Sequence, residues 1–208
     1  MANPNGPHGF SPVVQFQGND WNAKCNMYFI PSTDGSAYYI GDAVKTFTQS
    51  GTRGLDSDTG NIWGTMGIQR VQKSTGANSE RSRGVIVSIF RDPFNLDSLF
   101  IPATKTKNYY VLVMDDPYAV FEIQGDNAGT LPYPSIGSNA LYTPAAPSGI
   151  SPVSATVLAT ASIATTNTFP LKILGIAQRI NADDSAFTPL IVTWNTHELK
   201  GDTGSTPV

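Results

Sequence analysis

The strongest structural signal in the chain is the stretch Tyr109-Tyr110-Val111-Leu112-Val113-Met114-Asp115-Asp116-Pro117-Tyr118-Ala119-Val120-Phe121-Glu122-Ile123-Gln124. Its first six residues are aromatic, β-branched or otherwise apolar, which is the composition that strands favour. Asp-Asp-Pro is typical of a turn, and the last six residues alternate before the chain reaches Gly125-Asp126-Asn127. The stretch therefore predicts two strands separated by a turn.

Runs of the same kind recur along nearly the whole chain, with Gly- and Pro-rich turns between them. They are residues 13–16, 26–30, 37–40, 43–47, 62–68, 84–90, 153–168, 169–177 and 189–195. No stretch has a helical period over about 11 residues, and no repeat of fixed length occurs. We therefore expect an all-β fold, an antiparallel β-barrel or β-sandwich of roughly eight to ten strands, with an extended N-terminal arm and little helix.

The positions of the Pro- and Gly-rich segments predict how the chain is organised. Residues 1–12 are expected to form the extended arm, residues 13–200 a single β domain, and residues 201–208 a flexible tail. Within the domain, the prolines of residues 127–155 predict a long loop, with room for a short helical turn near 135–141. The polar segment 70–83 is expected to be a solvated loop.

The arm is the first candidate for binding a partner. Its candidate contact residues are Pro4, Asn5, Pro7, Phe10 and Pro12. Prolines lower the entropy cost of ordering an extended segment, and Phe10 would anchor it on a neighbouring subunit. The alternative is a frayed terminus. Either interpretation predicts that removing residues 2–12 leaves the domain folded.

Composition limits the possible partners and compartments. Only 14% of the residues are charged, the net charge is −3, and the 13 Lys and Arg residues are scattered, so we expect no nucleic-acid partner. No run of 18 apolar residues and no signal peptide occur, so we expect no membrane partner. A lone cysteine, Cys25, forms no internal disulfide and suits a reducing cytoplasm.

The residues that could perform chemistry are few and scattered. His8 and His197 lie near opposite ends, and we expect Cys25 to be a buried, inert thiol. The acidic pairs 115–116 and 183–184 follow strands, where turns favour Asp, although paired carboxylates could also serve glycoside hydrolysis. Residues 56–61 resemble part of a calcium loop but lack the distal Glu. We expect no catalytic residue, no metal site and no cofactor.

Several motifs, read together, form a recognisable set. They are Met1-Ala2-Asn3-Pro4-Asn5-Gly6-Pro7-His8-Gly9-Phe10, Trp21-Asn22, Tyr39-Ile40-Gly41-Asp42-Ala43-Val44-Lys45, Tyr110 to Gln124, Ile173-Leu174-Gly175, and Asn195-Thr196-His197-Glu198-Leu199. As a set they resemble a family of tailed-bacteriophage virion proteins of the capsid decoration, or cement, type. The matches span nearly the whole chain, but residues 53–83 and 132–155 match nothing in that pattern.

The resemblance implies a structural function. It predicts a virion protein made in the host bacterial cytoplasm that decorates the capsid exterior and bridges subunits of the major capsid protein. A homo-oligomer is expected, a trimer in preference to a dimer, with residues 109–114 and 127–152 as candidate subunit contacts. The alternatives are a tail or fibre component that binds a host glycan and, less favoured, a glycan hydrolase.

Overall fold

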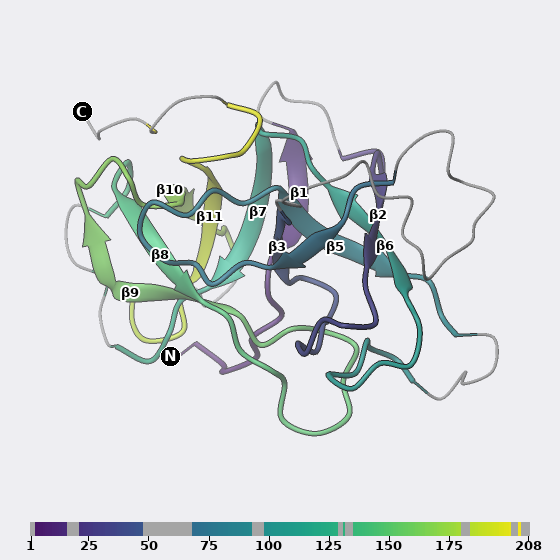
Figure 1. The fold of residues 1–208 in the computed structure, drawn as a ribbon. Coiled ribbons are helices and arrows are strands. Elements are labelled where there is room, and N and C mark those ends of the chain that lie inside the picture. The colour runs from purple at the N-terminus through teal and green to yellow at the C-terminus, as the bar shows by residue number, and fades with distance from the viewer. Residues whose placement is uncertain are drawn as a thin grey trace.

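The computed structural model describes residues 3–15, 21–47, 68–92, 98–128, 131, 135–179, 184–200 and 204. Regular structure in these residues consists of strands alone, arranged in two antiparallel sheets (Figure 1). The expected all-β fold is therefore confirmed. All but the last residue of the strand expected at 62–68, and nearly all of the tail at 201–208, lie outside the described residues.

The two sheets have six and five strands. In hydrogen-bonded order, the first consists of β1 (Ser11–Gln15), β7 (Ala119–Gln124), β11 (Pro189–Trp194), β10 (Leu171–Ile176), β8 (Asn139–Thr143) and β9 (Val157–Ala164). The second consists of β2 (Asn26–Ile30), β6 (Tyr109–Met114), β5 (Gly84–Ile89), β3 (Ala43–Thr46) and β4 (Val71–Lys73). The predicted turn at 115–117 carries the chain from β6 in one sheet to β7 in the other, so these consecutive strands do not pair.

Each sheet also curls back on itself. In the first sheet a parallel bridge joins Gly125, just after β7, to Leu158 in β9. In the second sheet a parallel bridge joins Phe29 in β2 to Arg70, just before β4. Closing contacts of this kind shield the backbone groups that an open sheet edge would expose. The arrangement thus has the two sheets of a sandwich, each with part of the closure of a barrel.

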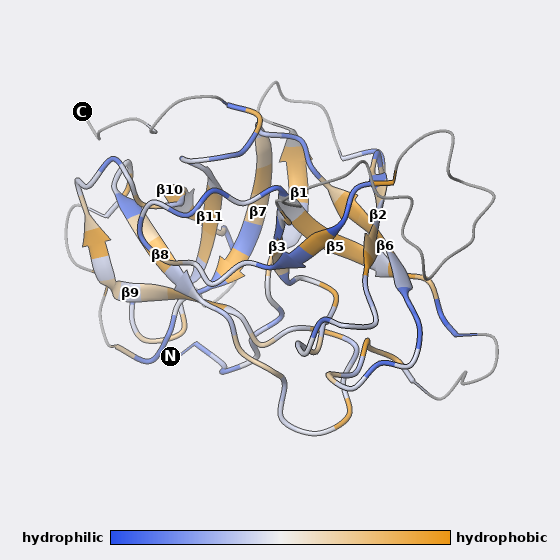
Figure 2. Ribbon diagram, in the orientation of Figure 1, coloured by the Kyte–Doolittle hydropathy of each residue, from blue (hydrophilic) through white to orange (hydrophobic). Residues whose placement is uncertain are grey.

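Side-chain alternation divides the apolar residues of the second sheet between two cores. Val85 and Met114 point toward the six-stranded sheet and join a core that contains Phe121 and Trp194. The adjacent Ile86 and Val113 point the other way, into a smaller core with Tyr28, Tyr38 and Ile101. Figure 2 shows the corresponding concentration of apolar residues on the strands. The five-stranded sheet is therefore apolar on both faces.

The described part of the N-terminal segment belongs to the domain, contrary to the expectation of a separate arm. The Phe10 ring is 2% exposed and lies 5.8 Å from the Phe121 ring and 5.4 Å from the Trp194 ring, between centroids. Residues 11–15 form β1, which pairs with β7. The buried Asn3 amide donates a hydrogen bond to the Ala186 carbonyl at 3.1 Å. The apolar surface of Phe10 is thus buried within its own chain.

Two expected loops also contain strands. The segment 127–155 includes β8, which pairs with β9 and β10. β8 takes up only the last part of 135–141, where a short helical turn was considered, and residues 135–138 form a turn in which the Ser138 N–H donates to the Ser135 carbonyl at 3.1 Å. The segment 70–83 includes β4 and the buried hydroxyls of Ser74 and Ser82, so it is not simply solvated. β4 and β8 are only three and five residues long, and each pairs with strands outside its expected loop. Residues 37–40, expected to be a strand, make only isolated bridges.

Replacing Phe10 by Ala should destabilise the protein by about 3–5 kcal/mol, because the truncation leaves a cavity among aromatic rings. Urea unfolding monitored by Trp fluorescence measures this change. Val13→Ala in the neighbouring strand is the control, since Val13 is exposed and should cost well under 1 kcal/mol. Equal stabilities for the two variants would contradict the packing of Phe10 described above.

Candidate functional site

The five residues expected to bind a partner do not form one surface. Pro4 and Asn5 are exposed, Pro7 is half-buried, Phe10 is in the core, and Pro12 stands in β1 opposite Phe121. Asn5 is held in place, since its side-chain oxygen accepts a hydrogen bond from the Gln124 amide at 3.1 Å. Only Pro4 and Asn5 therefore keep the exposure that the expected binding role requires.

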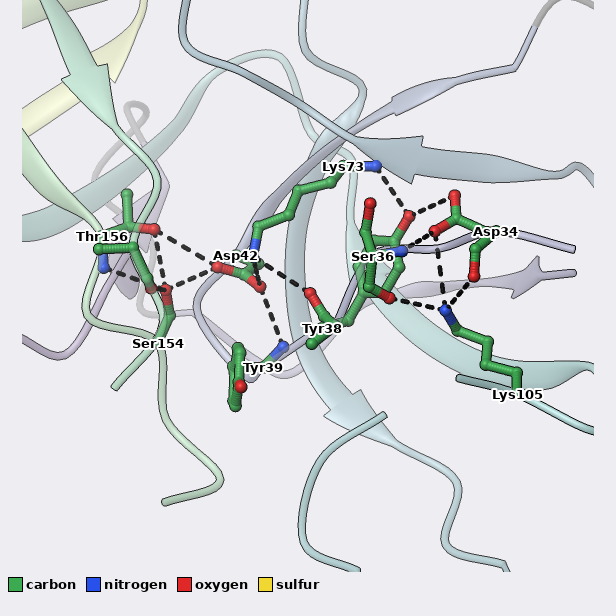
Figure 3. A network of polar contacts seen from close by, with 11 residues as sticks. Asp34, Ser36, Tyr38, Tyr39, Asp42, Lys73, Lys105, Ser154 and Thr156 are labelled. Carbon is green, nitrogen blue, oxygen red and sulfur yellow. Dashed lines mark hydrogen bonds and ion pairs between the residues drawn. The ribbon is translucent and has the colours of Figure 1, made fainter. Parts of the chain in front are cut away.

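An extensive polar cluster surrounds Asp42, which lies just before β3 (Figure 3). The carboxylate is 0% exposed and forms an ion pair with the Lys73 ammonium at 2.8 Å. It also accepts hydrogen bonds from the Ser154 hydroxyl at 2.6 Å and from the Tyr39 backbone at 3.0 Å. Thr156 lies next to Ser154, with 2.8 Å between their hydroxyl oxygens. The buried charge is thus surrounded by donors from three separate segments.

The cluster continues through Tyr38 to a second ion pair. The Tyr38 hydroxyl donates to the Asp34 carboxylate at 2.9 Å and accepts from the Lys73 backbone at 2.9 Å. The Lys105 ammonium donates to the carbonyls of Asp34 and Ser36, at 2.6 Å each. Burial raises the pKa of Tyr38 and lowers the pKa of Lys105. These groups fix the 34–42 loop against the 98–107 segment.

A second polar cluster is organised by Glu80. Its carboxylate accepts hydrogen bonds from the Ser74 hydroxyl at 2.9 Å and from the Thr75 and Gly76 backbones at 2.7 and 2.8 Å, and it pairs with Lys45. Burial tends to raise the pKa of Glu80, but the hydrogen bonds from Lys45, Ser74 and Thr75 outweigh it and hold the pKa below its usual range. This cluster anchors the turn that follows β4.

A third cluster joins the β6–β7 turn to the C-terminal segment. The Asp115 carboxylate accepts hydrogen bonds from the Tyr28 hydroxyl at 2.6 Å and the Asn26 amide at 2.9 Å, and Arg83 lies 3.5 Å away. Burial, followed by the hydrogen bond to Asp115, raises the pKa of Tyr28 to about 12. The Glu198 carboxylate accepts a hydrogen bond from the Thr46 backbone N–H at 2.7 Å. Asp115 is therefore more than the turn residue that its sequence context predicts.

The other candidate reactive residues are kept apart. Asp116 has the expected turn role, since its carboxylate accepts the Tyr118 backbone N–H at 2.8 Å. Cys25 is half-buried instead of fully buried, and burial together with nearby Asp115 raises the pKa of its thiol. The His8 imidazole lies 3.4 Å from Glu122, and His197 is buried. The calcium-like loop at 56–61 and Asp183 lie outside the described residues.

Two general features of the described residues complete the geometry. No group of three or more His, Cys, Asp and Glu side chains lies close enough to hold a metal ion there. The same residues include no helix of the length and apolarity needed to cross a membrane. The expected subunit contact at 109–114 is not an open edge, because β6 lies between β2 and β5. Of the two segments expected to make subunit contacts, this leaves residues 127–152.

Sequence reasoning did not identify Asp42, Lys73 and Ser154 as a cluster. Asp42 and Ser154 are 112 positions apart, and each residue alone is unremarkable in a sequence. The one available signal was Gly41-Asp42, at a turn that leads into a strand. Gly41 has φ +91°, and a Cβ there would lie 2.7 Å from the His8 carbonyl oxygen. That close approach brings the N-terminal segment against the cluster.

Compared with protein-family models, curated proteins and solved structures, the chain gives no match. The virion-protein resemblance therefore stays an expectation drawn from the sequence motifs. Function has to be argued from the residues and their geometry.

Asp42→Asn should destabilise the protein by about 3 kcal/mol, because it leaves the Lys73 ammonium without its buried countercharge. The new amide also turns donor hydrogens toward groups that already donate. Chemical denaturation measures the loss. Asp116→Asn is the matched control, since Asn keeps an acceptor for the exposed turn and should cost under 1 kcal/mol. Equal midpoints for the two variants would contradict the structural role of Asp42.

The buried His197 should make stability fall in mild acid. Burial lowers its pKa to about 4, and its Nδ1 accepts the Leu199 backbone N–H at 3.0 Å, which requires the neutral ring. The unfolded chain binds this proton near pH 6.5, so the contribution is complete above that pH and declines as the pH falls toward 4. Between pH 6.5 and 5 we expect a loss of about 2 kcal/mol.

Urea unfolding at pH 7.5 and pH 5 measures this loss. In His197→Gln the difference between the two pH values should shrink, whereas in His8→Gln it should persist. An unchanged pH dependence in His197→Gln would assign the acid sensitivity to other groups.

Proposed function

We propose that this protein is a capsid decoration protein of a tailed bacteriophage, which bridges major capsid subunits on the exterior of the virion. Its class comes from the sequence motifs, and its surface gives physical support. A decoration protein must hold neighbouring capsid subunits together through rigid contacts, and this task requires no catalytic groups. The polar clusters described above fit that task, because their charged groups hold loops and turns in place.

The observation that carries the proposal is a pair of large apolar side chains presented on rigid turns. Tyr118 is 56% exposed and Leu199 is 52% exposed. The Tyr118 backbone N–H donates a hydrogen bond to the Asp116 carboxylate, and the Leu199 backbone N–H donates one to the buried His197 ring. The Lys200 ammonium lies 5.1 Å from the Tyr118 ring centroid, so the two turns meet. Exposed aromatic and apolar anchors of this kind are typical of protein interfaces.

The proposal extends to assembly and place. Shell lattices present symmetry axes at which an oligomer makes several equivalent contacts at once, so individually weak contacts add up to firm attachment. We propose a homo-oligomer, a trimer in preference to a dimer, that is made in the host cytoplasm and attaches to the outside of the shell. The net charge of −3 favours the shell protein over packaged nucleic acid as its partner.

Electron cryo-microscopy of particles with and without this protein tests the proposal. We expect added density at regular positions on the outer shell and a lower temperature of particle disruption when the protein is absent. Tyr118→Asp should reduce occupancy, while Thr104→Asp, which adds the same charge at an exposed position on another loop, serves as the control. Density confined to the tail, or full occupancy with no effect on shell stability, would contradict decoration and cementing respectively.

A further inference from the structure

The loop between β8 and β9 combines an apolar tip with a firmly held base. Its tip residue, Ile150, is 85% exposed, more than any other large apolar side chain among the described residues. Gly149 precedes it with φ +81°, a conformation that favours Gly. Figure 1 shows this loop extending away from both sheets. Burying a large aliphatic side chain is favourable, so a partner that covers Ile150 would gain binding free energy.

The base of the loop is fixed by backbone hydrogen bonds. The Ile40 N–H donates to the Pro152 carbonyl at 2.8 Å, and the Ser154 N–H donates to the Ile40 carbonyl at 2.8 Å. Across the loop, the Ala155 N–H donates to the Ala145 carbonyl at 3.1 Å. The loop therefore leaves and re-enters the fold at one defined place.

The same base is connected to the buried ion pair. Ser154 is 0% exposed and donates its hydroxyl to Asp42, which pairs with Lys73 (Figure 3). Prolines at 144, 147 and 152 restrict the backbone further. Because hydrogen bonds and prolines restrict this projecting loop, it loses little conformational entropy on binding, which is typical of a preorganised contact element.

Charge identifies the kind of surface that would accept the tip. Residues 143–156 contain no charged side chain. Lys73, which is connected to the loop base through Asp42 and Ser154, is half-buried and its ammonium is paired with Asp42. A loop that enters a lipid surface generally combines apolar residues with Lys or Arg, and that combination is missing here. Uncharged, apolar and shape-restricted contacts are characteristic of the centre of a protein–protein interface.

We infer that the 144–153 loop is a docking element that inserts Ile150 into an uncharged apolar hollow on a subunit of the capsid shell. The inference rests on the proposed decoration function and adds to it a second contact, besides the turns that carry Tyr118 and Leu199, and the chemistry of the surface that receives it. The buried Asp42–Ser154 contact positions the loop, and Ile150 supplies the apolar contact.

The test compares the full chain and two variants for binding to shells assembled from the major capsid protein. Ile150→Asp should weaken binding roughly 10- to 100-fold or more, the factor expected for losing one buried aliphatic side chain. Ile136→Asp is the matched control, because Ile136 is also exposed, at 61%, on the turn at the other end of β8, and should bind as the unaltered chain does. Thermal unfolding should be the same for all three proteins.

Each alternative outcome is distinct. If the unaltered chain binds shells and Ile150→Asp binds equally well, the loop inference fails while decoration stands. If the unaltered chain does not bind shells, both fail. Sedimentation that shows Ile150→Asp dissociating an oligomer without weakening shell binding would assign the loop to a second copy of the chain. Ile150-dependent binding to phosphatidylcholine–phosphatidylglycerol vesicles, without shell binding, would assign it to lipid. Either result overturns the inference.

Discussion

The burial of the Asp42 carboxylate is the constraint on which much of the surrounding structure depends. Removing such a charge from water costs several kcal/mol, so the native state must supply a countercharge and several donors at once. Lys73 from β4, Ser154 from beyond β8 and the Tyr39 backbone provide them. If Lys73 moved away, the buried carboxylate would lose its countercharge, and if Ser154 or the Tyr39 backbone moved away, it would lose a hydrogen bond. The ion pair therefore contributes specificity of arrangement more than net stability.

The five-stranded sheet links the larger core, which it shares with the six-stranded sheet, to the smaller core on its other face. β5 and β6 supply side chains to both cores, because successive residues of a strand point to opposite faces. At one side of this sheet the N-terminal segment passes against Gly41 and inserts Phe10 into the larger core. The polar cluster and the aromatic core thus meet at the 41–42 turn, so a substitution in one should also disturb the packing of the other.

The comparison of sequence with structure separates local from distant information. The strands 26–30, 109–114 and 119–124 were predicted with the bounds that the structure has, because their apolar and β-branched composition is a local property. β4 and β8 were missed because they are short and lie among polar residues or prolines, which in a sequence favour a loop. Phe10 was misassigned for a different reason, since its Pro and Gly neighbours say nothing about rings more than 100 positions away. The Asp42 cluster is likewise assembled from residues that no spacing rule connects.

Rigidity and binding are linked in this fold by the way its polar groups are used. The carboxylates of Asp42, Glu80 and Asp115 accept hydrogen bonds that hold the ends of loops and turns in place. Side chains carried by those turns, such as Tyr118, are consequently held in position before any partner arrives. Preorganisation lowers the entropy lost on association, so a small apolar contact gains affinity without a larger interface. In the proposed decoration function such contacts would repeat on a lattice, and their effective concentration would multiply the gain in affinity.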